Sequence, residues 1–224
     1  MSIIVGIAEW GHVRQMKLLK HHHPHEGAPL THPRAYDFCC SLLFLGRRRE
    51  IFTGLARLSG ARPGSRVLDV GCGTGYLTRI LSPVVGPEGH ATGLDPSPAM
   101  VEHALRLAPL NCSYVVGEAG APQFADGSFD VVTCTLALHH VPEEGRGEAV
   151  REMFRVLRPG GRLLAADLRP PVNPLLLRAA RTLGGPALRQ DPARLLDDLV
   201  PAAGFSVVET GELGWLHYVR AVRP

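Results

Sequence analysis

Three glycines on alternate positions separate an apolar run from a helical pattern in the segment VLDVGCGTGYLT, residues 67–78. Glycine tolerates positive φ and lets a ligand approach the backbone closely. The helix that follows begins with N–H groups that have no partner within the helix. A strand, a glycine turn and a helix in this order predict a nucleotide-like binding turn, with a tight structural connection as the alternative.

The sequence after this turn alternates between apolar runs of strand length and helical patterns. This alternation predicts a parallel sheet with helices on both faces, and ligands then bind at the carboxyl ends of the strands. The expected strands are 67–70, 90–94, 113–116, 129–135, 162–166, 205–209 and 215–222. The expected helices are 76–85, 98–107, 148–157, 174–183 and 193–203.

The part of the chain before the turn has a different character. Residues 1–33 carry turn-like punctuation, and residues 34–58 have apolar positions at helical spacing that are interrupted near Gly46. We therefore expect an N-terminal arm and helical lid over residues 1–58, and a core domain over residues 59–224.

Composition excludes several classes of protein. Hydrophobic residues make up 45% of the chain and charged residues 20%, which is typical of a globular domain. A net charge of +3 disfavours a nucleic-acid partner, which needs a denser basic face. Five cysteines without a disulfide pattern favour a reducing, cytoplasmic compartment. The apolar run at the start is too short to span a membrane.

Two acidic residues refine the kind of ligand. The glycines follow a GxGxG spacing, not the GxGxxG of dinucleotide sites, and Asp69 comes two residues before the first of them. A carboxylate there disfavours a pyrophosphate and so a dinucleotide oxidoreductase. Asp95 ends the next strand, where it can accept hydrogen bonds from ribose hydroxyls. A nucleoside that carries an ammonium group and no phosphate fits both acids.

Four segments resemble motifs of the class I S-adenosylmethionine-dependent methyltransferases, in the small-molecule branch that includes the ubiquinone and menaquinone methyltransferases. They are VLDVGCGTG, GLDPSPAM, GEAGAPQFADGSFDVV and EMFRVLRPGGRLLAAD, and they lie in order within residues 60–167. The resemblance implies a Rossmann-like, seven-stranded and mostly parallel sheet with an antiparallel last strand. It also implies S-adenosyl-L-methionine as cofactor and S-adenosyl-L-homocysteine as product.

The resemblance further implies a set of cofactor contacts. The glycines would surround the methionine part, Asp69 would orient it through water, and Asp95 would hold the ribose. Glu118 stands where the family usually has Asp against the adenine amino group, and a solvated loop acid is its alternative interpretation. The full set is Asp69, Gly71, Cys72, Gly73, Gly75, Asp95, Pro96, Glu118, Ala119, Thr135 and Leu136.

Catalytic candidates follow from the chemistry of methyl transfer, in which the protein aligns the reactants and supplies a base for a weak nucleophile. His139 and His140 come just after the strand at 129–135, and histidine accepts a proton near neutral pH. By resemblance, His139 is the first candidate for the base, with Tyr36 as its partner from the lid. Packing of the loop or of a helix is the alternative for each.

We expect no metal, because the region after the fourth strand lacks the carboxylates of metal-dependent relatives. A histidine cluster in the N-terminal arm is the alternative metal site: His21, His22, His23 and His25. The sequence thus predicts a methyltransferase acting on O, N or C of a small, apolar metabolite. The competing hypothesis is a cofactor-binding protein without methyl transfer, serving as an activating partner or a cyclase-like scaffold. Monomer and homodimer stay open.

Overall fold

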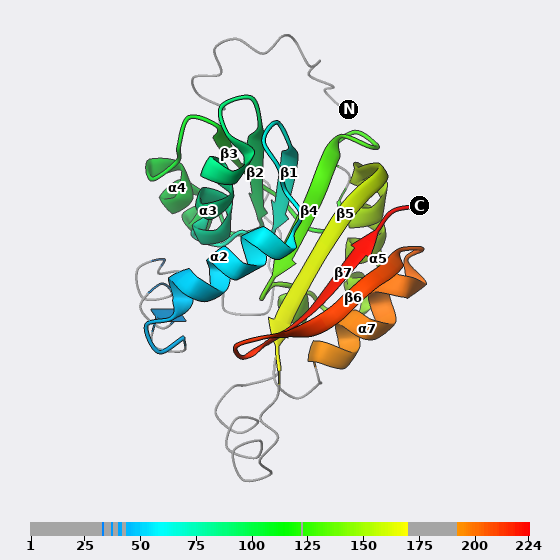
Figure 1. Ribbon diagram of the computed structural model, residues 1–224. Helices are drawn as coiled ribbons and strands as arrows, with labels where there is room; N and C mark the ends of the chain where they lie inside the picture. Colours follow the sequence, from blue (N-terminus) through cyan, green and yellow to red (C-terminus); the bar gives the residue numbers. More distant parts are fainter. Residues whose placement is uncertain (1–32, 34–36, 38–39, 42–43, 122, 170–191) are drawn as a thin grey trace.

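The fold is built around one seven-stranded sheet in the order β3-β2-β1-β4-β5-β7-β6 (Figure 1). The computed structural model describes residues 33, 37, 40–41, 44–121, 123–169 and 192–224. The strands are β1 Arg66–Val70, β2 His90–Asp95, β3 Cys112–Val116, β4 Phe129–Thr135, β5 Leu157–Leu168, β6 Ser206–Leu213 and β7 Leu216–Val222. The helices are α2 Arg48–Leu58, α3 Tyr76–Val85, α4 Pro98–Arg106, α5 Glu143–Val156 and α7 Pro192–Ala202, with a 3-10 turn η1 at Leu138–His140.

The strand directions confirm the predicted class. Strands β1 to β5 pair in parallel, and β7 runs antiparallel to both of its neighbours, β5 and β6. The chain builds outward from β1 through β2 to β3, then returns to the other side of β1 with β4. The switch point therefore lies between β1 and β4, where sheets of this kind bind ligands at the carboxyl ends of the strands.

Each face of the sheet has its own hydrophobic core. Helices α2, α3 and α4 cover one face, and α5 and α7 cover the other (Figure 1). Side chains alternate along β1, so that Val67 packs under the first group of helices, whereas Leu68 and Val70 pack under the second. Asp69 shares the face of Val67 and is only 2% exposed. One acidic side chain of β1 is therefore placed in the interior beneath α3.

Local signals set the ends of the helices near the site. Helix α3 starts after Gly75, which adopts φ +75°, and ends at Gly86, which adopts φ +67°. The side chain of Ser97 caps α4 by accepting from the backbone N–H of Met100 at 3.4 Å, and Pro98 occupies the first helical position. These signals are local in sequence, which is why the predicted bounds of α3 are confirmed and those of α4 differ by one residue.

Two predicted boundaries were wrong by five residues, and both flank α5. The helix begins at Glu143 rather than at residue 148, with Glu143 and Glu144 in its first turn, where acidic side chains interact favourably with the helix dipole. Strand β5 begins at Leu157 rather than at residue 162, because Leu157 already pairs with Phe129 of β4 across an irregular step of the ladder. Residues 159–161, which the predicted bounds left between the helix and the strand, therefore lie within β5.

The segment before the core is described in part. The predicted interruption near Gly46 is confirmed, since Leu45 and Gly46 both have positive φ, +48° and +77°. The helix α2 that follows contributes Ile51 and Leu55 to the core beneath α3. The helix predicted at 174–183 and the arm at 1–32 lie outside the described residues, and the division at residue 58 and the lid stay predictions. No helix in the described part of the chain is long and apolar enough to cross a membrane.

Candidate functional site

The glycine turn that follows β1 is held by its neighbours on both sides. Gly71, Gly73 and Gly75 have φ of +70°, +53° and +75°, in the left-handed region that favours glycine. The amides of Gly71 and Cys72 donate to the carbonyl of Leu94 at 2.8 and 3.0 Å, which ties the turn to β2. A Cβ on Gly71 would lie 2.2 Å from the Cβ of Ala137, just after β4. The turn is therefore in contact with β2 on one side and with the segment after β4 on the other.

We expect Gly71→Ala to destabilise the fold more than replacement of another glycine that has the same backbone strain. Gly64 is the matched control, because its φ is +83° and an added Cβ would meet nothing within 4 Å. Both variants pay about 1–2 kcal/mol for a left-handed alanine, but only Gly71→Ala also collides with Ala137, at a further cost of about 1–3 kcal/mol. Urea unfolding measures the difference. Equal destabilisation of the two variants would contradict the close approach, and adding Ala137→Gly should restore part of the loss at Gly71 alone.

Asp69 is a buried carboxylate that is hydrogen-bonded by two hydroxyl groups. Its Oδ2 accepts from Thr78 Oγ1 of α3 at 2.6 Å, and its Oδ1 accepts from Thr133 Oγ1 of β4 at 2.8 Å. Burial raises the pKa of Asp69 to about 6, although both hydroxyl groups act to lower it. The same burial, with the nearby Asp69 and Asp95, raises the pKa of the Cys72 thiol. The turn thus lies beside a concentration of negative charge in a region of low dielectric constant.

Asp95 ends β2 as predicted and contacts the turn directly. Its Oδ2 accepts from the backbone N–H of Gly73 at 2.8 Å, and its Oδ1 accepts from the backbone N–H of Ser97 at 2.9 Å. Burial raises the pKa of Asp95, and Glu118 adds to the rise by charge repulsion. Each carboxylate oxygen has a second lone pair, so the side chain can accept two further hydrogen bonds from a ligand.

The other predicted cofactor residues border the same edge of the sheet. Pro96 and Glu118 are exposed, in the loops after β2 and β3, while Ala119 packs against the core beneath α5. Thr135 ends β4 and is 9% exposed, and its Oγ1 has no hydrogen-bond partner among the described residues. A buried hydroxyl without a partner at a strand end has the capacity to bind a ligand.

Leu136 adopts an uncommon backbone conformation at the end of β4. Its φ is +57°, a left-handed value that is strained for a residue with a Cβ atom and that clusters at functional sites. Its amide donates to the carbonyl of Ala166 in β5 at 2.8 Å. This turn brings Ala137 against Gly71 and starts the short helix η1, which carries both candidate histidines.

His139 forms a hydrogen-bonded pair with a residue that sequence reasoning missed. Its Nδ1 lies 2.6 Å from Oδ1 of Asp167, and the two side chains are only 8% and 1% exposed. Asp167 lies near the end of β5, and its Oδ2 has no hydrogen-bond partner among the described residues. An acidic residue closing the apolar run LLAAD is the same signal that singled out Asp69 and Asp95, so the sequence did contain it.

His140 lies against His139 with 4.0 Å between the ring centroids. Desolvation and the adjacent His139 lower the pKa of His140 to about 4. His140 is therefore neutral at physiological pH, and its backbone N–H donates to the carbonyl of Ala137 at 3.0 Å.

Tyr36, the predicted partner of His139, lies outside the described residues, as does the cluster His21, His22, His23 and His25. No group of three metal-ligating side chains occurs in the described part of the chain, and the expectation of no metal stays a prediction.

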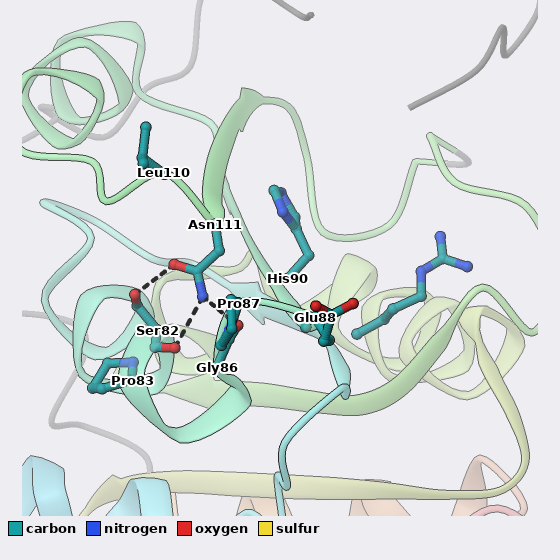
Figure 2. A pocket seen from close by; sticks show the side chains of 10 residues that line it. Ser82, Pro83, Gly86, Pro87, Glu88, His90, Leu110 and Asn111 are labelled. Carbon is teal, nitrogen blue, oxygen red and sulfur yellow. Dashed lines mark hydrogen bonds between the residues drawn. The ribbon is translucent and has the colours of Figure 1, made fainter. Parts of the chain in front are cut away.

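A surface hollow of about 810 Å³ lies away from these residues (Figure 2). It is lined by Arg66 and His90, which begin β1 and β2, and by the segments after α3 and before β3. Asn111 bridges two of its walls, accepting from Ser82 Oγ and donating to the carbonyls of Ser82 and Gly86 (Figure 2). The hollow is therefore at the amino ends of the strands, opposite the predicted site.

The residues at the carboxyl edge fit a cationic nucleoside. Gly71 and Gly75 leave no room for side chains, since a Cβ on Gly75 would lie 2.6 Å from the ring of Tyr114. Two buried carboxylates favour a positive charge, and Asp95 retains acceptor capacity for hydroxyl groups. The structure thus brings together the predicted residues of β1, β2 and β4 and adds Asp167 from β5.

Comparison with known proteins agrees with this chemistry. The family described as "Methyltransferase domain" matches residues 67–161. The ubiquinone/menaquinone biosynthesis C-methyltransferase UbiE of Ectopseudomonas mendocina is 39% identical over 152 residues, which are 66% of this chain and 59% of that protein. The chain thus spans about three fifths of the length of this curated relative.

Solved structures show the same fold. A methyltransferase dependent on S-adenosylmethionine from Aquifex aeolicus is similar over 86% of this chain and 99% of its own, with a TM-score of 0.68 and 22% identity. The YcgJ protein of Bacillus subtilis is similar over 73% of this chain and 72% of its own, with a TM-score of 0.61 and 27% identity. Residues 67–161 thus match the methyltransferase domain family, and the chain has the fold of solved S-adenosylmethionine-dependent methyltransferases and sequence similarity to the ubiquinone/menaquinone biosynthesis C-methyltransferases.

Proposed function

We propose that this chain transfers a methyl group from S-adenosyl-L-methionine to a small, apolar acceptor with an ionisable ring hydroxyl, of the quinol type. The relative at 39% identity is named as a C-methyltransferase of quinone biosynthesis, which supports the acceptor class. The observation that carries the proposal is the buried His139–Asp167 pair, because it provides a base at the same edge of the sheet as the cofactor turn.

The cofactor supplies an electrophilic methyl group when it is bound, and residues of β1 and β2 would hold it. The backbone of Gly71, Cys72, Gly73 and Gly75 would surround the methionine part, and Asp95 would accept from the ribose hydroxyls. Asp69 would act through its charge, because it is only 2% exposed beneath α3, where it bonds to Thr78 and Thr133. Thr135 and Leu136 would border the reacting centre, and Glu118 and Ala119 would lie beside the adenine.

His139 would take the proton of the acceptor. With Asp167 ionised, Nδ1 of His139 must donate the 2.6 Å hydrogen bond, which leaves Nε2 unprotonated and able to act as a base. Removal of the hydroxyl proton makes a quinol ring electron-rich at the neighbouring carbon. His139 would hold the hydroxyl proton on Nε2 while the ring carbon takes the methyl group and the sulfur keeps the bonding pair. The same ring carbon would then lose its own proton to solvent, and Nε2 would return the held proton to the ring oxygen. Tyr36 remains a proposed partner of this base.

The same arrangement serves transfer to oxygen or nitrogen, so the acceptor atom is a matter for experiment. Cofactor binding without transfer, as an activating partner or a cyclase-like scaffold, does not require a base held by a buried carboxylate. The His139–Asp167 pair and the C-methyltransferase relative both favour transfer over that alternative.

We propose a cytoplasmic protein without a nucleic-acid partner, as a monomer or a homodimer. Four of the five cysteines lie in the described residues and are buried, and three of them are free thiols, which suits a reducing compartment: Cys72, Cys112 and Cys134. A net charge of +3 is small for binding nucleic acid.

The test is an acceptor screen with a product that can be identified. The purified chain is incubated with S-adenosyl-L-methionine and, separately, a reduced unmethylated naphthoquinone with a short side chain, a simple phenol and an amine. We expect S-adenosyl-L-homocysteine to form with the quinol, and mass spectrometry to find the new methyl group on its ring carbon. Methylation of the phenol or amine in preference to the quinol would contradict the acceptor class. Cofactor binding without turnover on any acceptor would favour the non-transferring alternative.

A further inference from the structure

A carboxylate from the segment before the core contacts the glycine turn. Oδ1 of Asp37 accepts from Thr74 Oγ1 at 2.8 Å and from Nη1 of Arg48 at 2.9 Å. Its Oδ2 lies 3.8 Å from Nε2 of His103 in α4. One side chain thus connects the turn after β1 with the start of α2 and with α4.

Thr74 occupies the centre of the turn and is held at two points. Its side chain is 1% exposed and bonds to Asp37, and its carbonyl accepts from Nη1 of Arg79 at 2.6 Å. Thr74 follows Gly73, whose amide donates to Asp95, and precedes Gly75, the N-cap residue of α3. Any shift of Thr74 would therefore move the backbone on which the methionine part of the cofactor rests.

Arg48 fixes Asp37 in this position. The guanidinium group of Arg48 lies 3.9 Å from the ring centroid of Tyr76 in α3, and the residue is only 7% exposed. Its Nε is buried and has no hydrogen-bond partner among the described residues. A buried guanidinium group needs a counter-ion, so the interior that α2 and α3 form selects a carboxylate at position 37.

We propose that Asp37 is a positioning residue for the cofactor turn. Held by Arg48, it orients the side chain of Thr74 and thereby the backbone of Gly73 and Gly75. This inference rests on the proposed cofactor binding and extends it to a residue that lies 34 positions before Gly71 in the sequence. Because binding linkage is reciprocal, the bound cofactor must stabilise the Asp37–Thr74 contact by the same factor by which that contact improves cofactor affinity.

The sharpest test is Thr74→Val, which removes one hydroxyl and keeps both the side-chain shape and the Arg48–Asp37 pair. We expect the dissociation constant for S-adenosyl-L-homocysteine, measured by calorimetry, to rise about five- to tenfold, the effect of one hydrogen bond. Thr92→Val is the matched control. Thr92 of β2 is also buried, and its hydroxyl contacts Ser113 of β3, away from the turn. The control should bind as the unaltered protein does.

A double-mutant cycle separates positioning from general stability. Asp37→Ala combined with Arg48→Met removes the carboxylate without leaving a buried unpaired charge. Adding Thr74→Val to this pair should weaken binding no further, whereas a merely structural role predicts additive losses. Thr74→Val alone keeps the test decisive if the double variant fails to fold.

Unchanged affinity in Thr74→Val, or an equal loss with and without Asp37, would overturn the inference while the unaltered protein still binds. If the unaltered protein binds neither S-adenosyl-L-methionine nor S-adenosyl-L-homocysteine, the proposed function fails and this inference fails with it.

Discussion

Replacing His139 by Ala should lower turnover about 10²-fold or more and leave the affinity for S-adenosyl-L-homocysteine within about twofold of the original. General-base catalysis by a positioned side chain contributes 10²–10⁴-fold. The hydrogen bonds described for His139 join it to Asp167 and Arg146, away from the glycine turn. Turnover on the acceptor that the screen identifies and calorimetric binding give the two quantities separately.

Asp167→Asn tests the same pair from the other side. The amide keeps the size of the carboxylate, but it no longer requires Nδ1 of His139 to be the donor, so the population of the basic Nε2 tautomer falls. We expect turnover to drop at least tenfold.

His90→Gln is the matched control for these variants. His90 is a half-buried histidine that bonds to Ser113 Oγ at 2.9 Å, and it lies at the opposite end of β2 from Asp95. Its replacement should leave turnover unchanged. Full turnover in His139→Ala would assign the His139–Asp167 pair to packing of the loop after β4, and the base would then have to be sought elsewhere.

The sequence predicted the positions of the residues that a local pattern places. Gly71, Asp69 and Asp95 are recognisable because a strand, its last acidic residue and the following turn are contiguous in the chain, and parallel strands align their carboxyl ends. Contacts between distant segments were not predicted. His139 and Asp167 are 28 residues apart, and Asp37 and Thr74 are 37 apart, so each pairing exists only once the sheet has formed.

The errors at α5 and β5 have the same physical origin. The pattern around residues 159–161 is typical of a turn between two elements. Local propensity alone therefore predicts that a helix or strand ends there. Pairing of Leu157 with Phe129 instead extends the strand through these glycines. The backbone conformation of Leu136 is likewise imposed by its hydrogen bond to Ala166 and the contact of Ala137 with Gly71, which no local pattern indicates.

In the absence of cofactor, Asp69→Asn should gain stability relative to the unaltered protein as the pH rises. Burial raises the pKa of Asp69 to about 6 from 3.8. The folded state therefore binds more protons than the unfolded state between these values, and the contribution of Asp69 to stability is largest below about pH 4 and is lost as the pH rises through about 6. The ionised form costs about 3 kcal/mol at neutral pH, at 1.36 kcal/mol per pKa unit.

The measurement is the free energy of unfolding in urea for both proteins from pH 4.5 to 7.5. A hydrogen bond from Arg47 lowers the pKa of Glu50 and one from Tyr218 lowers that of Glu209, so these two groups titrate below Asp69. The difference between the two proteins removes their contributions. The free energy of unfolding of Asp69→Asn should rise by about 2–3 kcal/mol relative to that of the unaltered protein across this pH range. A difference that does not change with pH would mean that Asp69 is not a strained, buried charge.

The affinity for the cofactor should depend on pH in the opposite direction from the contribution of Asp69 to stability. A cationic ligand beside the turn stabilises the ionised form of Asp69, so its affinity should rise with pH until about pH 6 in the unaltered protein. In Asp69→Asn the affinity should increase less with pH, because Asp95 is then the only one of these two buried acids that can ionise. Stability lost to a buried charge in the free protein is thus recovered in the complex, which is the expected pattern for a residue whose role is to bind positive charge.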